Sequence, residues 1–438
     1  MTAARARHPR PRTAAERRAS RPRPLRLLGP RPVGRSGLTA RERIGLLLDA
    51  GSFAELEVFR AQGEHGGVIA GSGTVDGRRV FVYAQDDAAA GPEHTAKVHR
   101  VMDLALAAGA PLIGITDGAR VPQGPRSPAA DGATLRRHVE ASGVIPQISV
   151  VLGAGGAYSP VLADFTFAVG QDAGAGLAGF VHDDEEGCLH DVRYLVSLLP
   201  SNSAESAPAH PACGAGADER PRLAEILPPD PDQPYDMREV LAELVDDGEY
   251  IEVHEHWAGN VVCALGRVDG EVVGVVGNQP TVLAGALDGA GARKAARFVR
   301  FCDAFGIPLV TLVDVPGFAP GDEQDLQHGA KLLYAYCEAS VPRVQVVVRK
   351  AYGEAYTVMD SRSVGTDLSL AWPTNVITEN ARSAELLPPA HPHHAAEWGL
   401  VDDVIDPVRT RAAVARGLSM LRHKRTEAPR RKHGNIPL

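Results

Sequence analysis

Apolar and polar positions along this chain follow an order that is written twice. In the first half, the alternating residues 80–83 follow an Asp-Gly pair at 76–77, which is a strong signal for a β-hairpin turn. A run with helical spacing over about residues 95–108 ends before Gly109, and the apolar residues 111–115 then predict a buried strand. The pattern therefore predicts a hairpin, a helix and a strand in that order.

The second half of the chain repeats these features. An Asp-Gly pair at 269–270 lies between apolar runs, a helical pattern at 293–305 ends before Gly306, and residues 308–312 predict a buried strand. The copies are separated by 193 residues at the hairpin and by 197 at the helix and the strand. Features that recur in one order at nearly one spacing indicate an internal duplication, so we expect two related α/β lobes. The expected boundaries are a basic tail at 1–37, a first lobe at 38–199, a Pro-rich linker at 200–234 and a second lobe at 235–438.

A glycine-rich stretch follows a buried strand in each half. Residues 155–158 read Gly-Gly-Ala-Tyr after the apolar run 145–152, and residues 353–356 read Gly-Glu-Ala-Tyr after the apolar run 344–348. A turn at the end of a buried strand can present free backbone N–H groups, which stabilise a carbonyl oxygen that gains negative charge. Paired glycines in such a turn are often only a tight bend, and the spacing by itself leaves both interpretations open.

Composition separates the first 37 residues from the rest of the chain. They carry eleven Arg, one acidic residue and six Pro, whereas the whole chain of 438 residues has a net charge of −8. With few large apolar residues to bury, this tail is predicted to be disordered; a transit peptide and a nucleic-acid contact are the alternatives. The uncharged residues 148–163 are broken by Gly, Ser and Pro and are fewer than the roughly 20 residues of a membrane span. We therefore expect a soluble cytoplasmic protein with no membrane segment and no nucleic-acid partner.

Few other residues carry recognisable chemistry. The five cysteines lie far apart, so free and mostly buried thiols are expected rather than a disulfide framework. His391, His393 and His394 lie among prolines without ligand partners, which favours a solvated loop and no metal site. No phosphate-binding P-loop, serine-hydrolase elbow or metalloprotease motif occurs. The candidate cations for an acidic substrate are Lys294, Lys331 and Lys350.

Several longer motifs carry a resemblance to a known family. They are Lys-Ala-Ala-Arg-Phe-Val-Arg-Phe-Cys-Asp at 294–303, Val-Asp-Val-Pro-Gly-Phe at 313–318, Gly-Ala-Lys-Leu-Leu-Tyr-Ala-Tyr at 329–336, Arg-Lys-Ala-Tyr-Gly at 349–353 and Lys-His-Gly-Asn-Ile-Pro-Leu at 432–438. With shorter matches from Thr39 onward, they resemble the carboxyltransferase (beta) subunits of biotin-dependent acyl-CoA carboxylases, above all those of propionyl-CoA carboxylases. The resemblance covers nearly all of the chain after residue 38, although the sequence is shorter than the family at several loops.

This resemblance implies an α/β fold of two tandem crotonase-like lobes, each a ββα superhelix. It implies that the first lobe holds an acyl-CoA thioester, and that the second holds carboxybiotin carried by a partner protein. Because the chain resembles neither a biotin carrier nor an ATP-binding carboxylase, it would need a biotin carboxylase and biotin carrier subunit, and a homo-oligomer of beta-type subunits is expected. The resemblance places the family's catalytic oxyanion holes on Gly155 and Gly156 for the thioester enolate, and on Glu354 and Ala355 for the biotin ureido oxygen. It places the substrate-binding positions on Ala157, Tyr158 and Thr357. It places the cofactor-binding positions on Gly353 and Tyr356.

Glu354 is the position at which the two glycine-rich stretches differ. A carboxylate about 4 Å from a developing oxyanion would oppose it by roughly 4 kcal/mol at an effective dielectric near 20, more than the roughly 3 to 4 kcal/mol that one donor supplies. Three explanations are open: the side chain points away, it is protonated, or the second loop no longer holds an oxyanion. A glutamate in place of a glycine with positive φ would also cost about 1 to 2 kcal/mol.

These observations leave three hypotheses for function. The first is a carboxyltransferase subunit that moves a carboxyl group from carboxybiotin to a short-chain acyl-CoA such as propionyl-CoA. The second is a biotin-independent decarboxylase of malonyl or methylmalonyl thioesters in a biosynthetic pathway, in which Glu354 would donate a proton. The third is a non-catalytic assembly or regulatory paralogue of active beta subunits.

Overall fold

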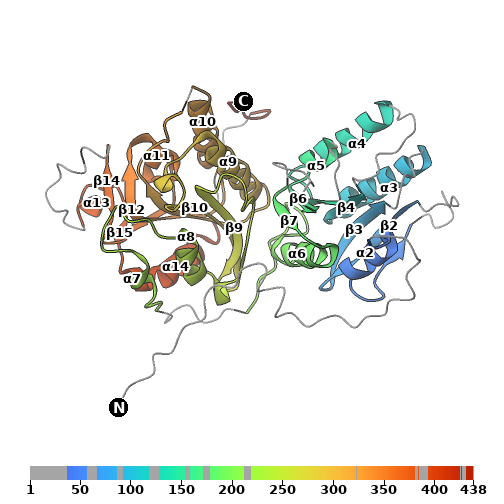
Figure 1. Cartoon of the computed structure of the whole chain (residues 1–438), viewed down its shortest axis with the longest axis horizontal. Coiled ribbons are helices and arrows are strands. Elements are labelled where there is room, and N and C mark those ends of the chain that lie inside the picture. The colour runs from blue at the N-terminus through green and yellow to red at the C-terminus, as the bar shows by residue number, and fades with distance from the viewer. Residues whose placement is uncertain are drawn as a thin grey trace, which may run out of the picture.

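The computed structural model of the chain contains two mixed β-sheets with helices packed against them (Figure 1). Figure 1 shows the first sheet and its helices, coloured blue to green, beside the second set, coloured yellow to red. The structure describes residues 37–56, 67–85, 92–117, 128–152, 158–170, 178–211, 219–321, 323–379, 383, 393–424, 426 and 431–437.

The first lobe comprises the elements from α2 to α6. They are α2 (Ala40–Leu47), β1 (Ala54–Glu55), β2 (Val68–Val75), β3 (Arg78–Gln85), α3 (Pro92–Ala108), β4 (Leu112–Asp117), α4 (Pro128–Ala141), β5 (Gln147–Leu152), α5 (Tyr158–Leu162), β6 (Phe165–Val169), β7 (Phe180–His182) and α6 (Glu185–Leu198). The strands form one sheet in the order β1-β2-β3-β4-β5-β6-β7. β1 to β3 pair antiparallel, whereas β3 to β7 pair parallel, and the helices α3, α4 and α5 connect the parallel strands β3 to β6.

The second lobe comprises the elements from α8 to α14, and the short helix α7 (Leu223–Ile226) precedes it. They are α8 (Met237–Leu244), η2 (Asp246–Gly248), β8 (Tyr250–Glu252), β9 (Val261–Val268), β10 (Glu271–Asn278), η3 (Leu283–Gly285), α9 (Gly289–Ala304), β11 (Leu309–Val315), α10 (Glu323–Glu338), β12 (Arg343–Tyr352), α11 (Gly353–Val358), η4 (Arg362–Val364), β13 (Leu368–Ala371), β14 (Val376–Thr378), α13 (His394–Glu397), β15 (Asp403–Val404), η5 (Pro407–Arg409) and α14 (Thr410–Leu421). The sheet order is β15-β13-β12-β11-β10-β9-β8, with β14 paired to β12.

The two hairpin turns predicted from the Asp-Gly pairs are confirmed, and they have the same backbone. Asp76 and Gly77 have φ values of 50° and 78°, and Asp269 and Gly270 have values of 54° and 81°. Two successive left-handed residues form a two-residue hairpin turn whose twist matches that of the flanking strands. Aspartate and glycine are among the residues that tolerate this conformation best. The two copies therefore have nearly the same backbone φ angles at this turn.

A partly buried aspartate and an arginine hold each of these turns, and each such pair is a hairpin clasp. In the first lobe, Asp49 accepts the two backbone N–H groups of the turn at 3.0 and 2.9 Å, and Arg193 of α6 donates to Asp49 at 2.8 Å. In the second lobe, Asp246 accepts the corresponding N–H groups at 2.9 and 2.7 Å and is bound by Arg411 of α14. The side chain of Arg193 is 20% exposed, whereas that of Arg411 is 0% exposed. The second clasp is thus the more deeply buried of the two.

One hydrophobic cluster runs through both lobes. It joins residues of β3 to β6 and α6 in the first lobe to residues of α9, α10 and β11 in the second. At the boundary, Phe165 of β6 packs edge-on against Phe301 of α9, with ring centroids 4.6 Å apart. Cross-lobe hydrogen bonds run from Arg267 to the carbonyl of Ser197 at 2.8 Å and from the N–H of His254 to the carbonyl of Gly179 at 2.8 Å. The lobes therefore share a core and a polar seam.

Several predicted details differ from the structure. β12 is longer than the apolar run 344–348 and continues to Tyr352, and α9 begins at Gly289 because Asp288 caps it. Cys188, Cys263 and Cys302 are buried free thiols, but Cys337 is exposed.

Across the described residues, no helix has the length and apolar character needed to cross a bilayer, and no group of three or more His, Cys, Asp or Glu could hold a metal ion. The predicted lobe boundaries remain predictions.

Candidate active site

Each glycine-rich stretch follows a strand that ends beside a parallel neighbour, at the carboxyl edge of the sheet of its own lobe. β4 and β5 are parallel, with Asp117 opposite Leu152, and β11 and β12 are parallel, with Val315 opposite Ala351. Ligands of open α/β sheets bind beyond the carboxyl ends of the strands. A short helix follows each stretch, α5 in the first lobe and α11 in the second. The duplication therefore places the two stretches at equivalent edges.

The glycines of the first stretch cannot be placed. Gly155, Gly156 and Ala157 lie outside the described residues, and Tyr158 is described only by its backbone, as the first residue of α5. Their assigned roles therefore remain predictions from the sequence.

α5 itself is anchored near its carboxyl end. The hydroxyl of Thr166 donates to the carbonyl of Pro160 at 2.8 Å, and the guanidinium of Arg297 donates to the carbonyl of Ala163 at 2.6 Å. Arg297 belongs to α9, so one anchor of the first lobe's short helix comes from the second lobe, and its side chain is exposed. Beside this contact, burial raises the pKa of Asp164 to about 6, although the charge of Arg297 opposes the rise.

The second stretch begins at a glycine that no other residue could replace without strain. Gly353 has φ 59°, in the left-handed region, and a Cβ built on it would lie 2.7 Å from the carbonyl oxygen of Glu379. α11 starts at this residue. The first N–H groups of a helix have no acceptor within the helix, so the N–H groups of Glu354 and Ala355 are available to a ligand. The side chain of Ala355 is buried in the core.

Glu354 has an exposed side chain. Among the described residues, neither a hydrogen bond nor an ion pair joins its carboxylate to another group. The expected backbone strain is wrong: the residue with positive φ is Gly353, and Glu354 lies in the first turn of α11 outside the left-handed region. An exposed carboxylate is screened by water, in which its opposition to an oxyanion 4 Å away falls to about 1 kcal/mol. The exposure agrees with the explanation that the side chain points away.

Tyr356 and Thr357 take different places on α11. Tyr356 is buried in the core, and its hydroxyl has no hydrogen-bond partner among the described residues. Burial, with a smaller contribution from Asp360, raises the pKa of Tyr356 to about 12. Thr357 is half-buried, and its hydroxyl donates to the carbonyl of Gly353 at 3.3 Å. Tyr356 therefore packs α11 against the core, and the hydroxyl of Thr357 forms a hydrogen bond within the helix.

Asp314, at the end of β11, organises the strand next to the second stretch. The register of β11 against β12 shifts at this residue, so β12 bulges opposite it, and a bulge re-aims the strand that carries it. One carboxylate oxygen accepts the N–H of Lys350 at 3.0 Å, and the other accepts from Nε of Arg349 at 3.0 Å. Burial raises the pKa of Asp314, and the charge of Arg349 opposes that rise. In the sequence, Asp314 appeared only as part of the motif at 313–318, without a role of its own.

Two of the three candidate cations already have partners. The ammonium of Lys294 is buried and donates to the carbonyls of His254 and Trp257 at 2.9 and 3.1 Å, and burial lowers its pKa. Lys350 forms an ion pair with Asp232 at 2.8 Å. The third, Lys331, is half-buried on α10 and has no polar partner within the described part of the chain. Lys294 and Lys350 are therefore already engaged and are not free cations for a substrate.

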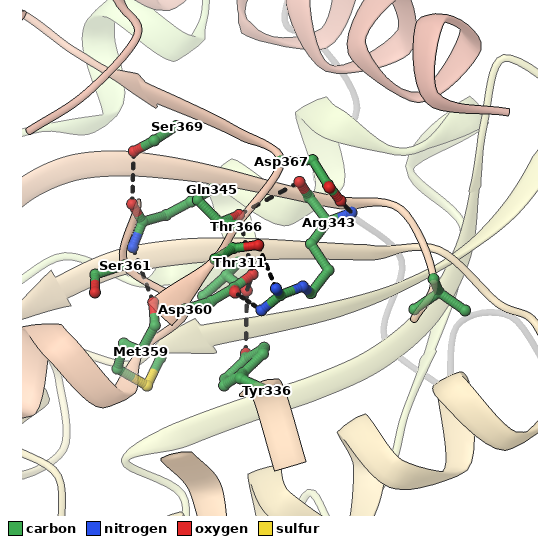
Figure 2. A network of polar contacts seen from close by, with 12 residues as sticks. Thr311, Tyr336, Arg343, Gln345, Met359, Asp360, Ser361, Thr366, Asp367 and Ser369 are labelled. Atoms are coloured by element: carbon green, nitrogen blue, oxygen red, sulfur yellow. Dashed lines mark hydrogen bonds and ion pairs between the residues drawn. The ribbon is translucent and has the colours of Figure 1, made fainter. Parts of the chain in front are cut away.

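A buried polar network lies behind the carboxyl end of α11 (Figure 2). Asp360, two residues after the helix, is 0% exposed and has φ 58°. Its carboxylate accepts from Arg343 at 2.6 Å and from the hydroxyls of Thr311 and Thr366 at 3.4 Å each. Tyr336 of α10 extends the network through Thr311 at 3.0 Å. Residue types and spacing carried no signal for this network, because its members come from β11, α10, β12 and the turns around η4.

Gln345 of β12 completes the support behind α11. Its side chain is 0% exposed, and its Nε2 donates to the carbonyl of Met359, the residue that ends α11, at 2.9 Å. The hydroxyl of Ser369 donates to Oε1 of Gln345 at 2.7 Å, which fixes the orientation of the amide. Figure 2 shows Gln345 between Ser369 and Met359.

Comparison with known proteins identifies the family. The model of the carboxyl transferase domain matches residues 32–180, 172–378 and 377–436. The chain belongs to the carboxyl transferase family. The resemblance inferred from the motifs is thereby confirmed.

Related members of the carboxyl transferase family match over most of their length. The propionyl-CoA carboxylase beta chain of Saccharopolyspora erythraea is 43% identical, and the alignment covers 91% of this chain and 90% of that protein. The methylmalonyl-CoA decarboxylase subunit alpha of Veillonella parvula is 40% identical, and the alignment covers 92% of this chain and 93% of that protein.

A solved structure of the same family has the same fold. Transcarboxylase 12S, determined as a hexamer assembly with hydrolysed methylmalonyl-CoA bound, matches with a TM-score of 0.84 and 37% identity over 92% of this chain and 93% of that one. The predicted α/β fold of two crotonase-like lobes is therefore confirmed.

Proposed function

We propose that this chain transfers a carboxyl group from carboxybiotin, carried by a partner protein, to a short-chain acyl-CoA such as propionyl-CoA. One observation carries the proposal: a chain of the carboxyl transferase family repeats the same strand, glycine-rich stretch and short helix at the ends of β5 and β12. Two such stretches suit two carbonyl groups that gain negative charge, one on the thioester and one on the urea of biotin.

In the first lobe, the proposed ligand is the acyl thioester. The N–H groups of Gly155 and Gly156 would stabilise the enolate oxygen that forms when the α-carbon loses its proton, and Ala157 and Tyr158 would contact the acyl group. One donor aimed at an oxyanion supplies about 2.7 to 4 kcal/mol, so two can lower the barrier to enolisation substantially.

In the second lobe, the residues fit the urea of biotin. Bound carboxybiotin supplies an activated carboxyl group. The N–H groups of Glu354 and Ala355 would hold the ureido oxygen, and Gly353 leaves room where a Cβ would meet the carbonyl of Glu379. Arg349 and Lys350 are already paired with carboxylates, so backbone donors would carry the negative charge. Tyr356 would support this loop through its buried ring.

Thr357 is the proposed residue for acyl selection. Its hydroxyl already donates to the carbonyl of Gly353, so the side chain offers a ligand its methyl group and no free donor. An apolar acyl chain suits such a wall better than a hydroxylated or charged one, because a polar substrate group would be left unpaired. This supports a short aliphatic acyl group.

The proposed partners follow from the same chemistry. The chain would work with a biotin carboxylase and a biotin carrier, as a homo-oligomer in the cytoplasm. The hexamer assembly of transcarboxylase 12S supports the oligomer.

The decisive experiment measures transfer in both directions. In the forward assay, the purified chain is combined with a biotin carboxylase, a biotin carrier, ATP, bicarbonate and acetyl-, propionyl- or butyryl-CoA. In the reverse assay, which needs no partner, methylmalonyl-CoA and free biotin are supplied, and propionyl-CoA and carboxybiotin are measured. Biotin-dependent formation of propionyl-CoA supports the proposal.

Other results of the same assays would support the alternatives. Release of CO₂ from methylmalonyl-CoA at the same rate with and without biotin would indicate a biotin-independent decarboxylase. Failure to bind or convert any acyl-CoA would indicate a non-catalytic paralogue. Neither alternative is favoured, since the named relatives are enzyme subunits that match more than nine-tenths of the chain.

A further inference from the structure

We propose that Gln345 and Asp360 are positioning residues, which fix the carboxyl end of α11 and thereby aim the backbone N–H groups at its start. The inference rests on the proposed function, because it assumes that these N–H groups hold the urea of biotin. Neither side chain would touch a ligand.

The first support is the contact of Gln345 with the end of the helix. Its amide is completely buried between Met359 and Ser369, at 2.9 and 2.7 Å. Because Ser369 donates to Oε1, the amide must present its NH₂ group to the carbonyl of Met359. A carbonyl at a helix end has no acceptor role inside the helix, so this bond replaces one that water would otherwise supply.

The second support is the backbone of Asp360. A left-handed conformation costs a non-glycine residue free energy, and such residues persist where the surroundings over-determine them. Here the surroundings are Arg343, Thr311 and Thr366, which hold the carboxylate inside the core. The turn that ends α11 is thus locked by side-chain contacts, as Figure 2 shows.

The third support is the small size of the helix. α11 has only six residues, about 9 Å at 1.5 Å per residue. Its start is Gly353, whose left-handed backbone forms a pivot between β12 and the helix. The buried side chains of Ala355 and Tyr356 hold the middle of the helix, and contacts at its far end add to the control of its direction. Gln345 and Asp360 fix that end, so their loss should tilt the N–H groups near Gly353.

The first test replaces the anchor on Met359 without removing volume. Gln345→Met keeps an unbranched side chain of similar size but has no donor for the carbonyl of Met359. A displacement of about 1 Å can reduce catalysis by about 100-fold, so we expect the reverse assay to show a kcat lower by about 10- to 100-fold. The KM for methylmalonyl-CoA and the binding of propionyl-CoA by calorimetry should change much less than kcat, because the proposed thioester contacts lie in the other lobe and only the acyl contact of Thr357 moves with α11.

The matched control is Gln147→Met. Gln147 is a buried glutamine at the start of β5, and its side chain bonds only to His138 among the described residues. It should lose stability comparably while leaving kcat unchanged. Thermal unfolding of both variants shows whether they are folded at the assay temperature.

The second test uses Asp360→Asn, because asparagine tolerates the left-handed region and has the same shape. The charged and titratable groups that face Asp360 are Arg343 and Asp367 near the start of β12, Tyr336 and Cys337 on α10, and Tyr356 on α11. Burial raises the pKa of Asp360 to about 7, against the opposing charge of Arg343. The ratio of variant to wild-type kcat should therefore approach one below pH 6 and fall at pH 8, where only the wild type has an ionised anchor. A purely structural role gives a constant ratio.

The outcomes separate the inference from the proposed function. A wild-type chain that forms no propionyl-CoA in the reverse assay removes both. If the wild type is active, three results would each remove only the positioning role. They are an unchanged rate for Gln345→Met, an equal loss of kcat and acyl-CoA binding in Gln345→Met, and an equal impairment of the control Gln147→Met. Should Gln345→Met not fold, the pH dependence of Asp360→Asn decides.

Discussion

The short helices that follow the two glycine-rich stretches are held in different ways. α11 ends on a buried network of its own lobe, in which Gln345 and Asp360 are inaccessible to solvent. α5 ends on Thr166 and on Arg297, an exposed side chain of the other lobe. The third residue of β5, which matches Gln345 in β12, is Ser149, and among the described residues no hydrogen bond joins its side chain to α5. The duplicated units thus share their scaffold, while the supports of the two sites have diverged.

The hairpin clasps provide the largest expected contrast between the lobes. Arg411→Ala removes a fully buried partner of Asp246, and breaking a buried ion pair in this way costs about 3 to 5 kcal/mol. Arg193→Ala removes the equivalent but partly exposed partner of Asp49, for which about 1 kcal/mol or less is expected. Urea denaturation of both variants measures the difference in the free energy of unfolding. Equal losses would show that burial does not distinguish the two clasps.

The free energy of unfolding should depend on pH through one aspartate in each lobe, Asp360 in the second and Asp164 in the first. The pKa of Asp360 is raised to about 7 and that of Asp164 to about 6, whereas an unfolded aspartate titrates near 4. Between those values the native protein binds protons that the unfolded chain releases, so the free energy of unfolding falls as the pH rises, by at most about 1.4 kcal/mol per pH unit per group. Asp360→Asn should flatten the curve from about pH 4 to 7, and Asp164→Asn only to about pH 6.

Asp49 gives the opposite sign and serves as the control for those curves. Hydrogen bonds from the hairpin turn and Arg193 hold its pKa well below the usual range, although partial burial acts against them. Its contribution to stability is therefore present above about pH 4 and is lost as the pH falls below it. Asp49→Asn should lower stability at neutral pH and should weaken the loss in acid.

Arg297 tests the dependence of the first site on the second lobe. Arg297→Ala removes the hydrogen bond to the carbonyl of Ala163, and an exposed bond of this kind is worth about 1 kcal/mol, or about fivefold in kcat/KM for the acyl-CoA. Arg297→Lys retains a donor and should restore most of the activity. Arg300→Ala is the control on the same helix, since Arg300 pairs with Glu338 instead. Equal effects of Arg297→Ala and Arg300→Ala would argue against a cross-lobe anchor.

The smallest expected effect concerns the residue that distinguishes the two stretches. Glu354→Gly makes them identical at Gly-Gly-Ala-Tyr, and removing a water-screened carboxylate should raise transfer by at most about fivefold, or about 1 kcal/mol. The gain should shrink at high ionic strength, where the exposed charge of Glu354 is already screened. A loss of activity would instead give Glu354 a direct role.

The sequence predicted what local patterns encode. Asp-Gly pairs need left-handed backbone, and so both hairpins could be located from two residues each. The end of β12 was missed because Arg349 and Lys350 interrupt its apolar run, and only the contacts with Asp314 and Asp232 explain how two cations continue a strand. Pairing with distant carboxylates leaves no mark on a hydrophobic pattern.

The candidate site was only partly predictable for a related reason. Gly353 was identified from the repeated stretch, and the structure explains it through its φ and the nearby carbonyl of Glu379. The strain expected at Glu354 was wrong because the left-handed residue lies one position earlier. Gln345 and Asp360 gave no signal, since their partners on β13 and β11 are near them only after folding.

The hydrophobic cluster that runs through both lobes has a consequence for how the chain arose and how it folds. A single ancestral unit would have exposed the face that Phe165 and Phe301 now cover, so it would have needed a second copy to bury it. Joining the two copies in one chain makes that contact intramolecular, and we expect the two halves to fold as one cooperative unit. Each half expressed alone should aggregate, whereas the two halves co-expressed as separate chains should reassemble.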